Sequence, residues 1–156
     1  FRNYAKFRGR ATRAEYWWFF LFTVLAQSVA SSINENFGNL VGLAVFLPGL
    51  AVHVRRMHDT GRSGWWVGAL YGSIAATVVA VVVLIIDAAV DFNDFADGSF
   101  ASDDFFGKNV SGGSIAFVGL AGLFMLAMLV VNIVFLCQRS IQSENRFGPP
   151  PPPRTL

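Results

Sequence analysis

The sequence predicts an all-α membrane protein with four transmembrane helices and both termini in the cytoplasm. The class follows from composition: 54% of the 156 residues are hydrophobic and only 14% are charged, whereas about 25% are charged in a typical soluble domain. The charges are also segregated, which leaves long runs with no charge at all. These runs indicate membrane spans rather than an oversized soluble core. The third observation, the distribution of Lys and Arg between the runs, predicts the orientation.

Four apolar runs supply the predicted spans, at about residues 17–33, 40–54, 65–86 and 115–137. A capping box formed by Thr12 and Glu15 should start the first helix near Arg13. The second run is short and contains Pro48, which predicts a kink. Residues 34–39, just before it, predict a tight loop. The fourth run has the full length needed to cross a hydrocarbon core of about 30 Å.

The segments rich in Lys and Arg all fall on one side if there are four spans. Residues 1–16 contain five of them, residues 55–64 three and the tail, residues 138–156, three, whereas residues 34–39 have none and residues 87–114 have one lysine. Three spans would place basic segments on both faces, so this pattern supports the second span independently of hydropathy. The positive-inside rule then places both termini in the cytoplasm.

The predicted organisation therefore has three parts. A basic interfacial segment is followed by a four-helix membrane domain, which carries an acidic external loop, and the chain ends in a cytoplasmic tail rich in proline. Their bounds are residues 1–16 for the first segment, 17–137 for the membrane domain, 87–114 for the acidic loop within it and 138–156 for the tail.

Two motifs and a short signature in the tail give the chain a resemblance. They are Phe7-Arg8-Gly9-Arg10-x-x-Arg13-x-Glu15-Tyr16-Trp17, then Arg55-Arg56-x-His58-Asp59-x-Gly61-x-Ser63-Gly64-Trp65-Trp66, and last Asn145-Arg146-Phe147-Gly148-x-Pro150. Over nearly its whole length the chain resembles the small bacterial inner-membrane family called domain of unknown function 805. The resemblance implies an α-helical, multi-pass protein of the bacterial inner membrane and implies no activity. The acidic loop and the polyproline ending depart from the family pattern.

The charged residues of the two motifs form the main candidate site, which we interpret as either an anionic-lipid or a structural ion-pair cluster. In the structural interpretation, Glu15 and Asp59 are counter-ions for neighbouring arginines. In the lipid interpretation, each cation near an anionic membrane surface contributes about 1 kcal/mol, and arginine holds phosphate with a planar fork. The candidate residues are Arg10, Arg13, Glu15, Arg55, Arg56, His58, Asp59 and Arg62.

A repeat of small residues predicts a helix-packing stripe on the third span, at Gly64, Gly68, Gly72, Ala76 and Ala80. Small residues four positions apart let a second helix approach closely. That helix could belong to the same chain or to a partner. Gly38 and Gly42 repeat the spacing on the second span.

No residue pattern in the sequence predicts catalysis, a cofactor or a metal site. His58-Asp59 resembles a metal-binding doublet, but such sites need several further ligands. The acidic loop starts like a calcium loop at Asp91, yet Phe95 occupies a ligand position. No nucleophile–base pair or phosphate-binding glycine loop is found, and spans interrupt the basic residues, which disfavours nucleic acid as a partner.

Two functions remain open from the sequence. The first is a non-catalytic accessory or interaction subunit of a larger inner-membrane complex, with a respiratory complex as one possible host. It would contact the lipid bilayer, with its anionic lipids, and would reach partner proteins through the third span, residues 87–114 or the proline-rich tail. The alternative is a lipid-binding or small-solute transport protein that acts as a homo-oligomer, which requires a polar cavity that the spans offer few groups to line.

Overall fold

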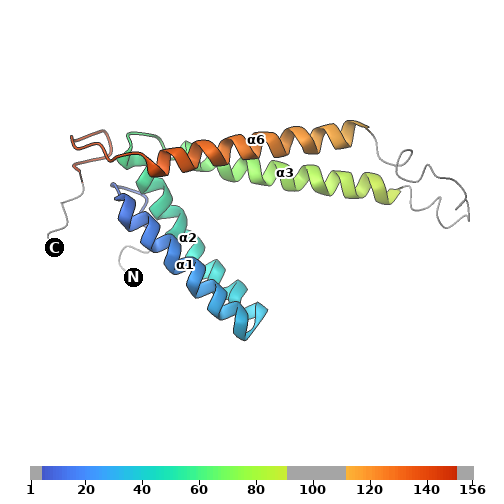
Figure 1. Ribbon diagram of the computed structural model, residues 1–156, viewed down its shortest axis with the longest axis horizontal. Helices are drawn as coiled ribbons and strands as arrows, with labels where there is room; N and C mark the ends of the chain where they lie inside the picture. The colour runs from blue at the N-terminus through green and yellow to red at the C-terminus, as the bar shows by residue number, and fades with distance from the viewer. Residues whose placement is uncertain (1–4, 91–111, 151–156) are drawn as a thin grey trace, which may run out of the picture. The chain divides into compact units, whose positions relative to one another are not determined.

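The structure, a computed structural model, describes residues 5–90 and 112–150. Its helices are α1 (Arg13–Ile33), α2 (Glu35–Asp59), α3 (Trp65–Val90) and α6 (Gly112–Cys137) (Figure 1). All four are long and apolar enough to cross a membrane, and no β-strand occurs in these described ranges. The prediction of an all-α membrane protein with four transmembrane helices is therefore confirmed. Most of the predicted acidic loop, residues 87–114, lies outside the described residues.

Helix α1 begins at Arg13, as the capping residues predict. The Thr12 hydroxyl accepts a hydrogen bond from the Glu15 N–H at 3.1 Å, which satisfies one of the backbone donors exposed at a helix start. The Glu15 carboxylate lies against Arg55, 3.0 Å from its Nη1 atom.

The predicted loop at residues 34–39 is wrong, because Asn34 alone separates α1 from α2. This single residue both ends one helix and starts the next. Its N–H donates to the Ala30 carbonyl at 3.1 Å, while its side-chain oxygen accepts from the Asn36 N–H at 2.8 Å. Asparagine is well suited to this position because its side chain caps the following helix. Helix α2 thus starts ahead of the apolar run and continues through Pro48.

Helices α1 and α2 form an antiparallel hairpin that packs through glycines of α2. A Cβ atom placed on Gly38 would lie 2.0 Å from Ser31 Oγ and 2.9 Å from Ser31 Cα. One on Gly42 would lie 2.9 Å from Gln27 Nε2. At Gly38 only glycine allows this approach, because the Ser31 Cα atom belongs to the backbone, whereas at Gly42 the flexible end of the Gln27 side chain could move aside. The contact at Gly38 agrees with the role of small residues in helix contacts within membranes. The predicted Gly38–Gly42 spacing is therefore an intrachain helix contact.

The chain divides into two compact units. The first unit, residues 1–68 and 132–156, contains α1, α2, the start of α3, the end of α6 and the C-terminal segment. Its buried core consists of Met57, Val67 and Leu136, and four partly buried hydrophobic residues pack against it: Tyr16, Leu50, Val54 and Phe135. This core therefore joins the start of α1, the end of α2, the start of α3 and the end of α6.

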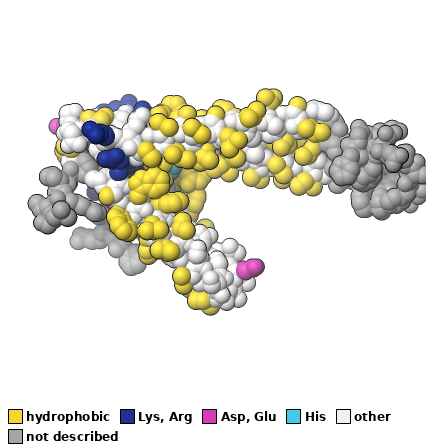
Figure 2. Space-filling model, in the orientation of Figure 1, with side chains coloured by type: hydrophobic (Ala, Val, Ile, Leu, Met, Phe, Trp, Pro, Cys, Tyr) yellow, Lys and Arg dark blue, Asp and Glu magenta, His cyan; other side chains and the backbone are white. Residues whose placement is uncertain are grey.

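The second unit, residues 69–131, consists of the remaining lengths of α3 and α6. The Thr77 hydroxyl of α3 donates to the Ala121 carbonyl of α6 at 3.2 Å, and Ala80 and Met128 are buried. Most other side chains on both helices are apolar and exposed, and Figure 2 shows hydrophobic groups over the helix surfaces. Apolar surface of this extent is what a lipid-facing helix requires.

Candidate functional site

The candidate site lies at the end of the first unit where the basic residues gather. We call it the basic end and define it as residues 5–16, 55–66 and 136–150. Figure 2 shows Lys and Arg side chains concentrated where α6 passes into the C-terminal segment. At its centre is a buried group of three charged residues, Arg10, Arg56 and Asp59, which we call the arginine network. Arg56 and Asp59 are completely buried and Arg10 is 8% exposed.

Asp59, the last residue of α2, lies between the two arginines of the network. Its Oδ1 atom accepts from Arg10 Nε at 3.0 Å, and its Oδ2 atom accepts from Arg56 Nη1. One carboxylate therefore faces two guanidinium groups, which leaves a net charge of +1 to be stabilised in a buried site. An unpaired buried charge is strongly unfavourable, so further acceptors must surround the arginines.

Backbone carbonyls of the C-terminal segment, residues 138–150, supply many of those acceptors for Arg10. Its Nη1 atom donates to Ser143 O at 2.9 Å and to Gly148 O at 3.4 Å. Its Nη2 atom donates to Ile141 O and, at 3.4 Å, to Asp59 O. Together with the bond to the Asp59 carboxylate, these contacts match the five N–H donors of a guanidinium group.

Arg56 holds the junction between α6 and the C-terminal segment. Its Nε atom donates to Leu136 O at 3.2 Å, and its Nη2 atom donates to Gln138 O. Its Nη1 atom, which pairs with Asp59, also lies 3.3 Å from the Ser140 hydroxyl. The last carbonyls of a helix have no partner within the helix, so a buried arginine at this place satisfies them.

The tail signature Asn145-Arg146-Phe147-Gly148 forms a turn that packs on His58. The rings of Phe147 and His58 stack with centroids 3.8 Å apart, and Asn145 Nδ2 donates to His58 O at 3.0 Å. The turn is closed by the Gly148 N–H, which donates to Asn145 O at 2.9 Å. Gly148 has φ +122, in the region that favours glycine. His58 also contacts the N-terminal segment, because its Nδ1 atom lies 3.3 Å from Gly9 O.

Gly61 has an equally specific role at the end of α2. It has φ +75, its N–H donates to His58 O, and the Arg62 N–H donates to Met57 O, both at 3.0 Å. This pair of bonds defines a Schellman motif, in which glycine takes the left-handed position after the helix. The motif turns the chain away directly after Asp59.

The other charged candidates lie at the basic end but outside the network. Arg55 pairs with Glu15 at the surface. Arg62 Nη1 donates to Gln138 Oε1 at 2.6 Å, and its guanidinium lies 3.7 Å from the centroid of the Phe135 ring. Arg13 is exposed, and its Nη1 atom is 3.5 Å from Cys137 O. The structure thus gathers all eight candidates in one region while dividing them into a buried network and surface contacts.

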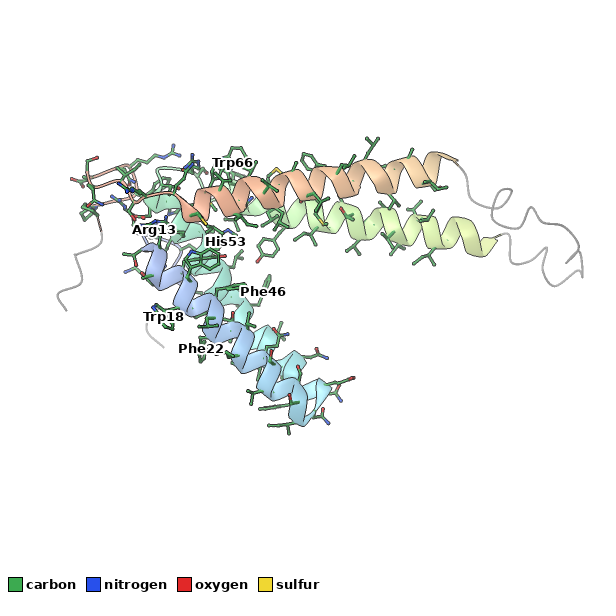
Figure 3. The ribbon with its side chains drawn as sticks, viewed as in Figure 1. Arg13, Trp18, Phe22, Phe46, His53 and Trp66 are labelled. Carbon is green, nitrogen blue, oxygen red and sulfur yellow. The ribbon has the colours of Figure 1, made fainter. Side chains whose placement is uncertain are left out.

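Two residues that the sequence analysis did not connect form a polar contact within the spans. His53 of α2 is 7% exposed and Asn132 of α6 is completely buried. The side chains of His53 and Asn132 interact, and Asn132 Nδ2 donates to Trp66 O at 3.4 Å. The Tyr16 ring lies 5.5 Å from the His53 ring, and Figure 3 shows the position of His53. Only their polarity inside apolar runs marked these positions.

The small-residue stripe on α3 is divided between the two units, with Gly64 and Gly68 in the first and Gly72, Ala76 and Ala80 in the second. A Cβ on Gly64 would be 3.0 Å from Val54, and Ala80 is buried. A Cβ on Gly72, by contrast, would meet no described atom within 4 Å, and Gly68 and Ala76 are exposed. Within their own units, Gly68, Gly72 and Ala76 therefore have exposed surfaces.

Within residues 5–90 and 112–150, no group of three or more His, Cys, Asp or Glu side chains is arranged to hold a metal ion. The His58-Asp59 doublet is instead divided between two different contacts. The His58 ring stacks on Phe147, whereas Asp59 faces Arg10 and Arg56.

The four apolar helices and the basic end define a multi-pass α-helical membrane protein. The profile of the family described as "Protein of unknown function (DUF805)" matches residues 4–149, and the chain belongs to this family. It is 30% identical to inner membrane protein YhaH of Escherichia coli (strain K12) over 96% of this chain and 90% of that protein. It is 33% identical to inner membrane protein YhaI of the same organism over 69% of this chain and 93% of that protein. Its place is therefore the bacterial inner membrane. No solved structure matches it.

Proposed function

We propose that this protein is a non-catalytic interaction subunit of a larger inner-membrane complex, for which a respiratory complex is one possible host. The observation that carries the proposal is what the charged residues of the two motifs contact. Arg10, Arg56, His58 and Asp59 all bond to or stack on the chain's own backbone and side chains. Charged groups that bond to their own chain in this way stabilise the fold, whereas a catalytic group must be able to reach a substrate.

The exposed small residues of the α3 stripe support the proposal, and we take them as the intramembrane contact site of the partner. Lipid tails are as apolar as most side chains, so helix association in the membrane depends on close packing. Exposed Gly68 and Gly72 leave room for a second backbone. Residues 87–114 and the proline-rich tail are further proposed contacts, and anionic lipids are the proposed lipid partners of the basic end.

The alternative is a homo-oligomer that binds lipid or transports a small solute. The buried His53–Asn132 contact favours this alternative, because polar groups inside spans are costly and often functional. A homo-oligomer could also use the Gly68–Gly72 surface, so the identity of the partner separates the two functions.

Gentle detergent extraction followed by native mass analysis tests both functions. We expect wild-type protein to co-purify stoichiometrically with other proteins, and Gly72→Leu to remove this association while leaving the chain folded, because Gly72 has no described neighbour to displace. Gly119→Leu on α6 is a matched control, since a Cβ there also meets nothing within 4 Å. A homo-oligomer that Gly72→Leu dissociates would support the alternative. Assembly unchanged by Gly72→Leu would remove the stripe from the proposal.

A further inference from the structure

We propose that the anionic-lipid surface of the basic end is formed by exposed cations outside the arginine network: Lys6, Arg8, Arg13, Arg139 and Arg146. This inference rests on the proposal that anionic lipids are partners of the basic end, and it assigns the residues that contact them. It separates a set of cations that hold the fold from a set that binds the membrane.

The first step is to identify which cations already have partners. Arg10 and Arg56 are buried with Asp59, and Arg55 pairs with Glu15. Arg62 is bonded to Gln138 and lies over the Phe135 ring. These four side chains are therefore poorly placed to contact lipid phosphates, although three of them belong to the most distinctive motif of the sequence.

The second step concerns the cations that remain. Within the described part of the chain, Lys6, Arg8 and Arg139 are exposed and form no ion pair or hydrogen bond. Arg13 is exposed with one carbonyl contact at 3.5 Å, and Arg146 lies over the Phe147 ring at 4.7 Å. Glu15 and Asp59 are already paired, so Glu144 is the one other described acid of the basic end.

The third step places these cations at headgroup depth. Arg13 is the first residue of α1, and Trp17 and Trp18, which are 40% and 64% exposed, follow one turn later (Figure 3). Trp65, at the start of α3, is 83% exposed. Tryptophan is enriched where the hydrocarbon meets the headgroups, and Arg139 lies two residues beyond the end of α6. The excess positive charge therefore lies beside a lipid interface, which favours lipid phosphates over free phosphate.

The test measures lipid retention in nanodiscs of phosphatidylcholine that contain a minor share of phosphatidylglycerol. Wild-type protein should retain phosphatidylglycerol preferentially by native mass spectrometry. The triple variant Lys6→Gln, Arg8→Gln, Arg139→Gln should lose about a hundredfold of this preference at low salt, since each cation contributes roughly fivefold. Its thermal unfolding in phosphatidylcholine should match that of wild type, because these side chains have no partners in the described fold. Glu144→Gln is the control and should leave the preference unchanged or raise it.

Three outcomes would overturn the proposal, and they differ in what they reject. A wild-type protein without preference for phosphatidylglycerol rejects anionic lipids as partners. A triple variant that keeps the wild-type preference rejects only this assignment of residues. Displacement of the lipid by excess inorganic phosphate, at constant ionic strength, rejects a lipid surface in favour of a site for a free anion. If the triple variant unfolds, the wild-type protein alone still tests the proposal. Its preference for phosphatidylglycerol should fall as the salt concentration rises, because salt screens exposed charges, and a preference that salt leaves unchanged would contradict the proposal.

Discussion

Arg10 shows how much of this protein depends on single side chains. Its guanidinium group joins the N-terminal segment to the last residue of α2 and to three carbonyls of the C-terminal segment. Lysine could not reproduce these contacts, because an ammonium group has three donors and lacks the planar fork. Asp59 is the matching anion, and it faces both buried arginines.

At this scale we expect Asp59→Asn to destabilise the protein by about 3 kcal/mol, because two buried cations lose their counter-ion. Thermal unfolding in detergent measures the loss, and the yield of folded protein should fall with it. Glu15→Gln is the matched control: its partner Arg55 is in a half-exposed pair, which should contribute no more than about 1 kcal/mol. Equal effects of the two substitutions would show that burial of Asp59 contributes nothing to stability.

At the scale of elements, the packing of the helices depends on small residues. In the α1–α2 hairpin, Gly38 lies against the backbone of Ser31 and Gly42 lies against the side chain of Gln27, so the two backbones approach closely at Gly38. Glycine lowers helix propensity by about 1 kcal/mol relative to alanine, and close packing offsets this loss. The hairpin therefore needs glycine for contact rather than for flexibility.

Gly38→Ala should accordingly weaken the hairpin, although alanine is the better helix former. The added methyl group would lie 2.9 Å from the Ser31 Cα atom, and backbone cannot move aside as a flexible side chain can. We expect a lower unfolding temperature and faster proteolysis near Asn34. Gly119→Ala should be neutral or stabilising, because it gains propensity and meets nothing within 4 Å. If Gly38→Ala behaves like Gly119→Ala, the two helices do not pack as closely as described.

On the scale of the whole molecule, the segments before α1 and after α6 meet at the end of α2. The Ala11 N–H donates to Arg55 O at 3.1 Å, and the Ile141 N–H donates to Asp59 O at 3.3 Å. Residues 138–150 are thereby attached to the end of α2. The polyproline sequence continues from this attached turn.

The proposed orientation places the basic end in the cytoplasm. In a Cys137→Ser background, a cysteine at Arg8 should resist an impermeant thiol reagent added to intact cells, whereas a cysteine at Ser99 should react, because positive segments remain inside. Permeabilised cells provide the control, since both positions should then be labelled. Labelling at position 8 alone, in intact cells, would reverse the orientation.

The sequence by itself determined the class of protein and the presence of four long apolar helices. Uncharged runs long enough to cross a bilayer have few other stable structures, because every backbone polar group in lipid must be bonded internally. The helix cap at Thr12 could also be predicted from the sequence, because a cap is a contact between residues three positions apart. The same local reasoning failed at residues 34–39, where one asparagine both ends and starts a helix.

Only the tertiary structure decided which arginines hold the fold and which face outward. Arg55 and Arg56 are adjacent in sequence, yet one is in a surface pair and the other is completely buried with Asp59. The acceptors of Arg10 and Arg56 are mostly backbone carbonyls of residues 136–148. Every residue has a backbone carbonyl, so the sequence does not show which carbonyls act as acceptors. These partners are identified only when segments 80 or more residues apart come together.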